Sequence, residues 1–147
     1  MRNLQRPGRS PVLAPNGMAS TSHALSTETA VNVLRNGGNA MDAAIAACAV
    51  QGVVEPESTG IGGDCFCLYS EGGSDKIIAM NGSGRAPAAM TAEWLLDQGI
   101  SEIVQHSPHA VTIPTAVDAW VQLNRDYGSK PLSDLLDPAI DYAENGF

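Results

Sequence analysis

The sequence predicts an α+β fold in which several helices surround a small antiparallel sheet. Three stretches lead to this prediction: an alanine-rich segment at residues 40–50, a glycine-rich corner at residues 60–63, and two short apolar runs at residues 65–69 and 76–80. The helices expected around these runs have apolar faces that two or three strands do not cover. The sequence therefore indicates part of a larger sheet-and-helix protein.

The N-terminal region is expected to begin irregularly and then form one helix. Residues 1–16 hold three prolines and three arginines and lack the apolar stretch of a secretory signal peptide, so we expect a cytoplasmic protein. Residues 17–22 are a candidate edge strand. Residues 23–35 have helical apolar spacing, with His23 as a cap or packing residue at the start and Gly37 beyond the end.

Residues 40–50 predict a buried helix. Asn39 is the expected N-cap, and Asp42 lies three positions later, near the positive end of the helix dipole. Asp42 is the only polar residue between positions 40 and 50, and the small side chains around it let neighbouring elements approach closely. The run is too short to span a membrane, which takes about 20 apolar residues.

The corner at residues 60–63 has two interpretations. Glycine is used where φ is positive or where a backbone or ligand comes close, so its three glycines form either a cradle of N–H groups for an anion or a tight turn. A dinucleotide-binding fingerprint needs a strand before its glycines and a helix after them. Here the order is reversed, which favours the tight turn.

The two apolar runs after this corner predict a hairpin that residues 71–74 connect. Its far end leads into residues 81–85, N-G-S-G-R, a loop loosened by glycine. Arg85 gives this loop a permanent, forked cation that matches a carboxylate. An isolated surface arginine is more often only solvated, so chemistry alone gives Arg85 modest weight.

Two short regions follow Arg85. Thr91 is expected to cap a short helix at residues 92–98. His106 and His109 lie three apart, but Pro108 between them disfavours the helix that would direct both at one metal ion. We expect a polar loop there, and no metal site.

The C-terminal third predicts two more helices. Pro114 opens an amphipathic helix that Gly128 ends, and residues 132–136 form about one further turn. Asp137 is the expected cap of the last helix, and Pro138 its first residue. The residues expected to face inward in that helix are Ala139, Ile140 and Ala143, and Gly146 stands where a C-terminal cap belongs.

Composition limits the classes of partner. The 147 residues are 44% hydrophobic and 16% charged, which is typical of an ordered globular protein. A net charge of −8 argues against nucleic acid and anionic membrane surfaces as partners. Cys48, Cys65 and Cys67 lack a second C-x-C pair or spaced histidines, so we expect three buried thiols in a reducing compartment, and neither metal nor cofactor.

Four segments resemble the N-terminal part of the γ-glutamyltranspeptidases, in the order of that family. They are L-R-N-G-G-N-A-M-D-A-A-I-A (34–46), V-V-E-P-E-S-T-G-I-G-G-D (53–64), G-R-A-P-A-A-M-T (84–91) and D-P-A-I-D-Y-A-E-N-G-F (137–147). The resemblance implies a fragment of the large subunit of an N-terminal-nucleophile hydrolase, an αββα sandwich of two antiparallel sheets between helices. Residues 17–147 would form the incomplete N-terminal portion of that domain.

The resemblance also implies a mechanism. In the family, a precursor cleaves itself into a large and a small subunit, and the threonine that begins the small subunit attacks the γ-glutamyl amide with its own amine as base. No threonine of this chain has that cleavage context; Thr21, Thr27, Thr29 and Thr59 all lack it. The expected partners are therefore the remainder of the large subunit, the small subunit, and a small-molecule amide or γ-glutamyl substrate.

One departure from the family pattern concerns substrate binding. Typical transpeptidases carry D-x-R-E before an Ala-Pro pair, and that arginine grips the glutamyl α-carboxylate. Here Ser83 stands in the place of the arginine and Arg85 is displaced by two residues. A shift of two keeps the same face of an extended chain, so Arg85 and Ser83 remain the substrate-binding candidates. The form N-G-S-G-R-A-P is more similar to transpeptidase-like amidohydrolases and acylases, which puts γ-glutamyl specificity in doubt.

Two alternatives to an enzyme portion stay open. In the first, the chain is a non-catalytic module that holds a small carboxylate between residues 60–63 and Arg85; in the second, it is an inert remnant whose apolar faces lead to association. Binding of small carboxylates by the isolated chain distinguishes the first, and sedimentation with urea unfolding distinguishes the second.

Overall fold

A computed structural model describes residues 11–147, so residues 1–10 of the expected lead-in lie outside the described part. The elements are α1 (Ala24–Arg35), α2 (Ala40–Val54), β1 (Cys65–Tyr69), η1 (Glu71–Gly73), β2 (Ile78–Gly82), α3 (Ala92–Asp97), η2 (Pro108–Ala110), α4 (Ala116–Tyr127) and α5 (Leu132–Asn145). The predicted α+β class is confirmed. None of the helices among residues 11–147 has the length and apolar character needed to cross a membrane.

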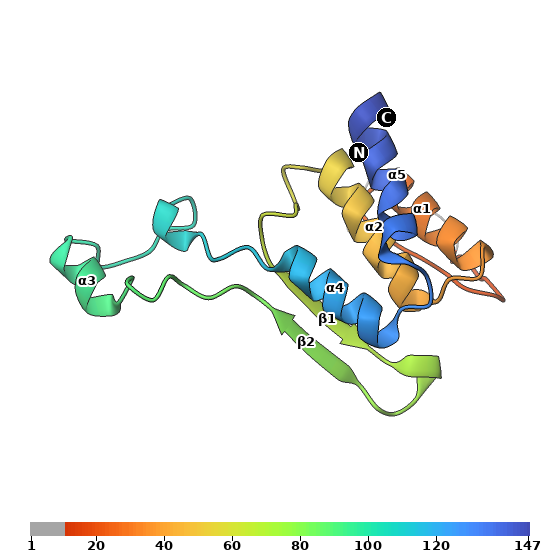
Figure 1. The fold of residues 1–147 in the computed structure, drawn as a ribbon, viewed down its shortest axis with the longest axis horizontal. Coiled ribbons are helices and arrows are strands. Elements are labelled where there is room, and N and C mark those ends of the chain that lie inside the picture. The colour runs from red at the N-terminus through yellow and green to blue at the C-terminus, as the bar shows by residue number, and fades with distance from the viewer. Residues whose placement is uncertain (1–10) are drawn as a thin grey trace.

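The centre of the molecule is α2, which contacts α1, α4 and α5 and forms with them a helical body (Figure 1). Ile45 and Val50 of α2 are buried against Trp120 of α4 and Leu135 of α5. The predicted buried helix is therefore confirmed, and it continues to Val54. Small side chains on several faces of α2 allow three helices to pack on it at once.

Local signals set the two helix ends that meet before α2. Gly37 has a φ of +81°, the N–H of Gly38 donates to the carbonyl of Val33, and the N–H of Gly37 donates to that of Leu34. This is a Schellman motif, and it confirms the predicted helix end with Gly37 beyond it. Asn39 is the N-cap of α2, as predicted, and it forms a capping box with Asp42.

Asp42 also joins α2 to a distant part of the chain. Its side chain is 0% exposed and accepts hydrogen bonds from the N–H of Asn39 (2.9 Å), the N–H of Ser129 (2.9 Å), the hydroxyl of Ser129 (2.5 Å) and the N–H of Lys130 (3.3 Å). Burial by itself raises the pKa of the Asp42 carboxyl, but these hydrogen bonds lower it below its usual value. Asp42 thus fixes the connection between α4 and α5 against the start of α2.

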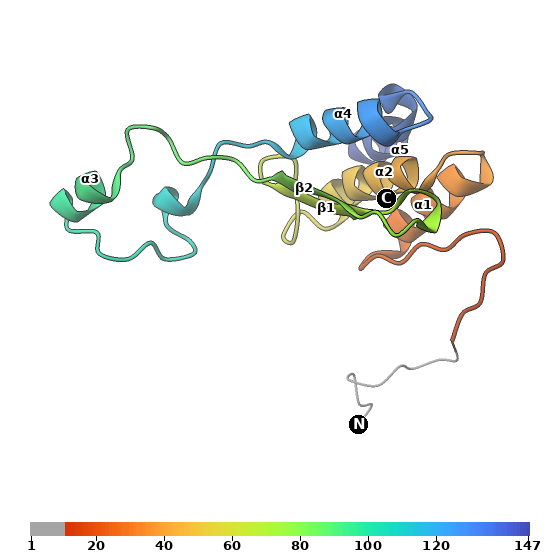
Figure 2. The ribbon, with the colours of Figure 1, turned by 90° about the horizontal axis from the view of Figure 1, so that it is seen from below.

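The sheet is one antiparallel hairpin, β1 paired with β2 so that Cys65 faces Gly82 and Tyr69 faces Ile78. β2 begins two residues later than predicted. One face of the sheet packs on α4, as Figure 2 shows, and Tyr69 contacts Tyr127 with ring centroids 5.2 Å apart. The other face is open: the side chains of Phe66 and Leu68 are 69% and 79% exposed.

Residues 86–111 form an arm that leaves the end of β2 and extends away from the helical body, with α3 at its tip (Figure 1). Thr91 caps α3, as predicted. The exposed fractions of Leu96, Val104 and Val111 in the arm are 62%, 59% and 65%. The arm thus has apolar side chains but no core of its own.

Several expectations about the C-terminal helices are wrong. α5 is one helix from Leu132 with Pro138 inside it, so Asp137 is not an N-cap. Ala139 is buried as expected, but Ile140 is 49% exposed and Ala143 is exposed. α5 begins at Leu132, six residues before the predicted first residue Pro138. Its inward face is set by Leu135, whose side chain is 2% exposed, together with Ala139. Gly146, with a φ of +87°, ends the helix as predicted.

Two further expectations need correction. Residues 17–22 form no strand; the hydroxyl of Thr21 instead contacts that of Thr27 at 2.7 Å. The three cysteines are free, but Cys48 is exposed and Cys65 and Cys67 are only half-buried, so the prediction of three buried thiols is wrong. An alanine-rich helix does not reveal which of its faces lacks a neighbour.

Candidate functional site

The candidate substrate-binding residues lie where β2 ends and the arm begins. Residues 83–85, here called the 83–85 loop, follow directly after Gly82, the last residue of β2. The glycine-rich corner enters β1 on the neighbouring strand, because Cys65 pairs with Gly82. The hairpin therefore brings together the two segments that the sequence singled out for function.

The base of the arm is held tightly at Gly84. The N–H of Ile113 donates to the carbonyl of Arg85 (3.1 Å). The chain that returns from the arm, called the returning chain, therefore runs beside the 83–85 loop. A Cβ at position 84 would lie 1.6 Å from the carbonyl oxygen of Ile113. Only glycine fits there, because any side chain would overlap the backbone of Ile113.

Asp64 lies at the centre of the junction where the glycine-rich corner, the 83–85 loop and the chain returning at Thr112 and Ile113 meet. Its Oδ1 atom accepts a hydrogen bond from the N–H of Gly84 (2.9 Å) and another from the hydroxyl of Thr112 (3.0 Å). These contacts, together with the hydroxyl of Ser83, lower the pKa of the Asp64 carboxyl. Asp64 is exposed, and its lowered pKa keeps the carboxyl ionised at neutral pH.

The start of α4 completes the junction. The carbonyl of Gly63 accepts hydrogen bonds from the N–H groups of Thr115 (3.1 Å) and Ala116 (3.0 Å), and the hydroxyl of Thr115 donates to the carbonyl of Gly82 (2.6 Å). α4 starts at Ala116, two residues after the predicted position, and its N-cap residue Thr115 directs its side chain to the sheet rather than to the helix. The corner, the sheet and α4 are thus joined by backbone groups.

Arg85 is exposed, and within residues 11–147 its guanidinium makes no hydrogen bond or ion pair. Ser83 is half-buried, its N–H is held by the side chain of Asn81 (3.0 Å), and it lines a small pocket of about 170 Å³ beside Thr115 and Asp118. The two candidates are neighbours on one loop. The structure supplies a free cation and a hydroxyl next to an ionised carboxylate.

The glycine-rich corner is a turn between α2 and β1 in this structure. Gly60, Gly62 and Gly63 all lack a positive φ, and a Cβ at Gly60 or Gly62 would meet no atom within 4 Å among the described residues. The positive φ expected as one reason for these glycines is therefore absent. The cradle of N–H groups for an anion stays a prediction, because the corner is open and, among the described residues, no group fills the space beside Gly60 or Gly62.

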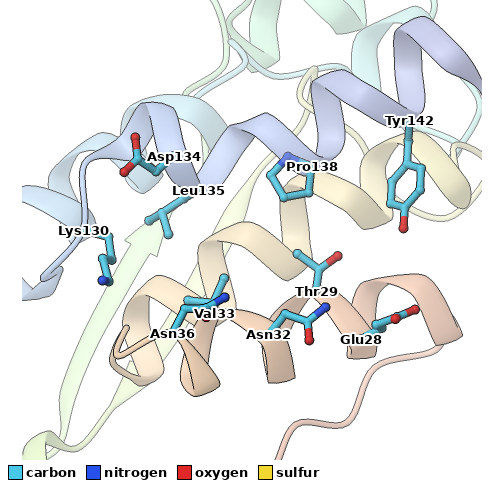
Figure 3. A pocket seen from close by; sticks show the side chains of 10 residues that line it. All are labelled: Glu28, Thr29, Asn32, Val33, Asn36, Lys130, Asp134, Leu135, Pro138 and Tyr142. Carbon is cyan, nitrogen blue, oxygen red and sulfur yellow. The ribbon is translucent and has the colours of Figure 1, made fainter.

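A separate pocket of about 370 Å³ lies between α1 and α5 (Figure 3). Residues of α1, including Asn32 and Glu28, line one side of it, and α5 lines the other; Lys130 lies at one end and Tyr142 near the other. It contains none of the predicted site residues. Among the described residues no buried side-chain polar atom lacks a hydrogen-bond partner, so nothing in this pocket requires a ligand.

Sequence reasoning did not identify Asp64 and Thr112 as functional candidates. Asp64 ends the glycine-rich motif immediately before a strand, and a charged residue at that point was a usable signal. Thr112 is 48 residues away and has no local signal at all. The two histidines are not part of this site: His109 packs edge-on against Trp94 in the arm, with ring centroids 5.9 Å apart.

Comparison with known proteins identifies one family. The family model described as gamma-glutamyltranspeptidase matches residues 26–147. The chain is 38% identical over 137 residues to a glutathione hydrolase-like proenzyme of Bacillus subtilis, YwrD, covering 92% of this chain and 26% of that protein. It is 36% identical to the oxamate amidohydrolase proenzyme of Klebsiella pneumoniae, over 91% of this chain and 26% of the relative.

Solved structures agree with the sequence relatives. The γ-glutamyltranspeptidase of Helicobacter pylori superposes with a TM-score of 0.84 at 33% identity, covering 94% of this chain and 40% of the matched chain. A cephalosporin acylase from Bacillus halodurans superposes with a TM-score of 0.79 at 38% identity, over 97% and 28% respectively. The chain thus spans about a quarter of the length of the curated relatives described above.

Proposed function

The chain belongs to the γ-glutamyltranspeptidase family, and from this premise we propose that it forms the N-terminal portion of an amidohydrolase acting on small-molecule amides. The relatives are named as a glutathione hydrolase-like proenzyme, an oxamate amidohydrolase and a cephalosporin acylase, and all three names describe hydrolysis of an amide. The three names differ in the acyl group that is removed, so the acyl group that this protein accepts is the part of the proposal that the substrate tests below determine.

In the proposed reaction a threonine hydroxyl outside these 147 residues attacks the amide carbonyl carbon. The carbon–nitrogen bond breaks, the amine leaves with the proton that the hydroxyl gives up, and an acyl ester remains. Water or an acceptor amine then attacks the ester and restores the hydroxyl. The word proenzyme in the names of the relatives supports a precursor that is cleaved to expose this threonine.

The proposed contribution of this chain is substrate binding. Arg85 would bind a carboxylate of the substrate through its two parallel N–H groups, and the hydroxyl of Ser83 would provide a second contact. Glutathione and oxamate both carry a carboxylate close to the amide that is hydrolysed. The observation that carries the proposal is that the hairpin and Asp64 bring the family's motif segments, including Arg85, into one junction.

The exposed apolar surfaces suggest where the rest of the enzyme packs. Phe66 and Leu68 on the open face of the sheet, and Leu96 and Val111 on the arm, are each more than half exposed. Apolar surface of this kind marks an interface. We propose that residues 17–147 are one incomplete domain portion, that the remaining polypeptide covers these surfaces, and that it completes a two-sheet sandwich.

Expression of the complete coding region that contains these residues tests the proposal. We expect the product to cleave itself into two chains, the second of which begins with threonine, and to release ammonia or amine from oxamate, a γ-glutamyl anilide or a glutaryl amide. Mass spectrometry identifies the cleavage, and the substrate with the highest kcat/KM identifies the acyl group. An encoded product without a downstream threonine chain would contradict the proposal.

The free guanidinium of Arg85 also supports a second candidate, a non-catalytic carboxylate-binding module. Calorimetry of the 147-residue chain with glutamate, glutathione and oxamate distinguishes the two candidates. Binding that is lost in Arg85→Ala supports the module. Absence of binding by the chain, combined with activity of the complete product, supports the enzyme.

A further inference from the structure

We infer that Asp64 is a positioning residue, which holds the 83–85 loop in the conformation that presents Arg85 to the substrate. This inference rests on the proposed function, since it assigns Asp64 to the same binding site. Asp64 itself does not touch the substrate in this assignment. Its effect passes through Gly84, the residue directly before Arg85.

The hydrogen bonds of the loop lead to Asp64. After Gly82 the chain leaves the ladder of β2, so its backbone is no longer fixed by the sheet. The N–H of Ser83 donates to the side chain of Asn81, a residue of β2 only two positions away (3.0 Å). The N–H of Gly84 donates to Asp64, which directly precedes β1 and is 20 residues away.

One oxygen atom joins both chains at the base of the arm. Oδ1 of Asp64 accepts from Gly84 on the outgoing chain (2.9 Å) and from Thr112 on the returning chain (3.0 Å). The returning chain in turn holds the carbonyl of Arg85 through the N–H of Ile113 (3.1 Å). Arg85 is therefore fixed on both sides of its backbone, and Asp64 sets the spacing of the two chains.

The exposure of Asp64 explains why its carboxylate controls the conformation of the 83–85 loop more than the stability of the fold. Asp64 is exposed, so water can replace its hydrogen bonds at little cost in stability. Gly84 lacks a Cβ and so has wide conformational freedom when it is not held. The close approach of Gly84 to Ile113, which leaves no room for a Cβ, is maintained only while the two chains stay in register. Loss of the carboxylate therefore releases Arg85 rather than unfolding the protein.

Steady-state kinetics of the complete gene product test the inference. With oxamate or a γ-glutamyl anilide, we expect Asp64→Ala to raise KM roughly 10-fold, with kcat changed less than about 2-fold, because the loss of a charged hydrogen-bond acceptor affects binding. Asp64→Asn should restore part of the effect, since its amide oxygen still accepts from Gly84. Asp75→Asn, on an exposed aspartate in the hairpin connection, is the matched control and should leave both constants unchanged.

An NMR titration of the 147-residue chain separates this inference from the proposed function. The amide proton of Gly84 should shift with pH, with a midpoint below the usual aspartate range, and Asp64→Asn should abolish that shift. If the Gly84 shift is present but the complete product hydrolyses no amide, the proposed function is wrong, while the hydrogen bond by which Asp64 positions the 83–85 loop is confirmed. An unchanged KM in Asp64→Ala, an absent Gly84 titration, or a melting temperature of Asp64→Ala as low as that of Asp42→Ala would each overturn the inference.

Discussion

Two aspartates join distant parts of this chain with the same chemistry in opposite surroundings. Asp42 is 0% exposed and accepts hydrogen bonds from Ser129 and Lys130, whereas Asp64 lies on the surface and accepts from Gly84 and Thr112. Water can replace the hydrogen bonds of an exposed carboxylate, but buried donors that lose their acceptor stay unpaired. We therefore assign Asp42 to the stability of the fold and Asp64 to the geometry of the proposed substrate site.

The same contrast holds between the helical body and the arm. In the body, α2 buries its apolar side chains against three helices, and no buried side-chain polar atom in the described part of the chain is without a partner. In the arm, Leu96 and Val111 are more than half exposed. The body thus satisfies its own packing, while the arm and the open face of the sheet leave apolar side chains exposed, which we propose other polypeptide covers.

The largest effect on stability is expected in the core of the body. Ile45→Ala removes a side chain that is 2% exposed and should lower the free energy of unfolding by about 3–4 kcal/mol. Phe66→Ala, on the open face of the sheet, is the matched control and should change it by less than about 0.5 kcal/mol. Urea unfolding of both variants gives the two values. Equal losses would show that the open face is packed and that the contrast is wrong.

A somewhat smaller effect is expected at the buried aspartate. Asp42→Ala leaves the N–H groups of Ser129 and Lys130 without their acceptor and should cost about 2–3 kcal/mol. Asp64→Ala should leave the urea midpoint nearly unchanged. Comparing the urea unfolding of the two variants tests the contrast directly, because both variants remove the same chemical group, one buried and one exposed. A large loss in Asp64→Ala alone would reverse the two assignments.

The contribution of Asp42 should depend on pH. Its folded-state pKa is lowered from the ordinary value of 3.8, so its stabilisation is fully present above that value and is lost as the pH falls through the lower folded-state pKa. The difference in unfolding free energy between the wild type and Asp42→Asn should therefore shrink as the pH is lowered through this range. Urea melts at a series of pH values measure it. A difference that stays constant with pH would mean that the carboxylate does not ionise in the folded chain.

The smallest effect on stability is expected at Arg85. Arg85→Ala should change the unfolding free energy by less than about 0.5 kcal/mol, like Arg125→Ala on the exposed side of α4, because neither side chain is buried. In the complete enzyme, Arg85→Ala should weaken substrate binding by about 1.5–3 kcal/mol, the range for hydrogen bonds to a charged group. The KM of the two variants tests this, and equal values for both would discard the carboxylate clamp.

Much of the helical body was predictable because its signals are local. The helix end at Gly37 and the N-cap at Asn39 were predicted, because the Schellman motif and the capping box found there depend on residues at most five apart. The outward direction of Ile140 and the exposure of Cys48 were not predictable. Which face of an apolar helix is covered depends on elements that are distant in the sequence.

The candidate site shows the same difference between local and long-range signals. Ser83 and Arg85 came from a motif, and the structure places both at the end of β2. Asp64 and Thr112 were missed, since the bond between them joins residues 48 apart.

The sequence by itself determined the family, the helix ends at Gly37 and Asn39, the hairpin and the loop that carries Arg85, because each is encoded in contiguous residues. Only the tertiary structure decided which two aspartates bind which remote backbone groups, and which apolar faces stay open. Long-range hydrogen bonds and burial depend on where chain segments meet in space, and no spacing rule within one segment records that.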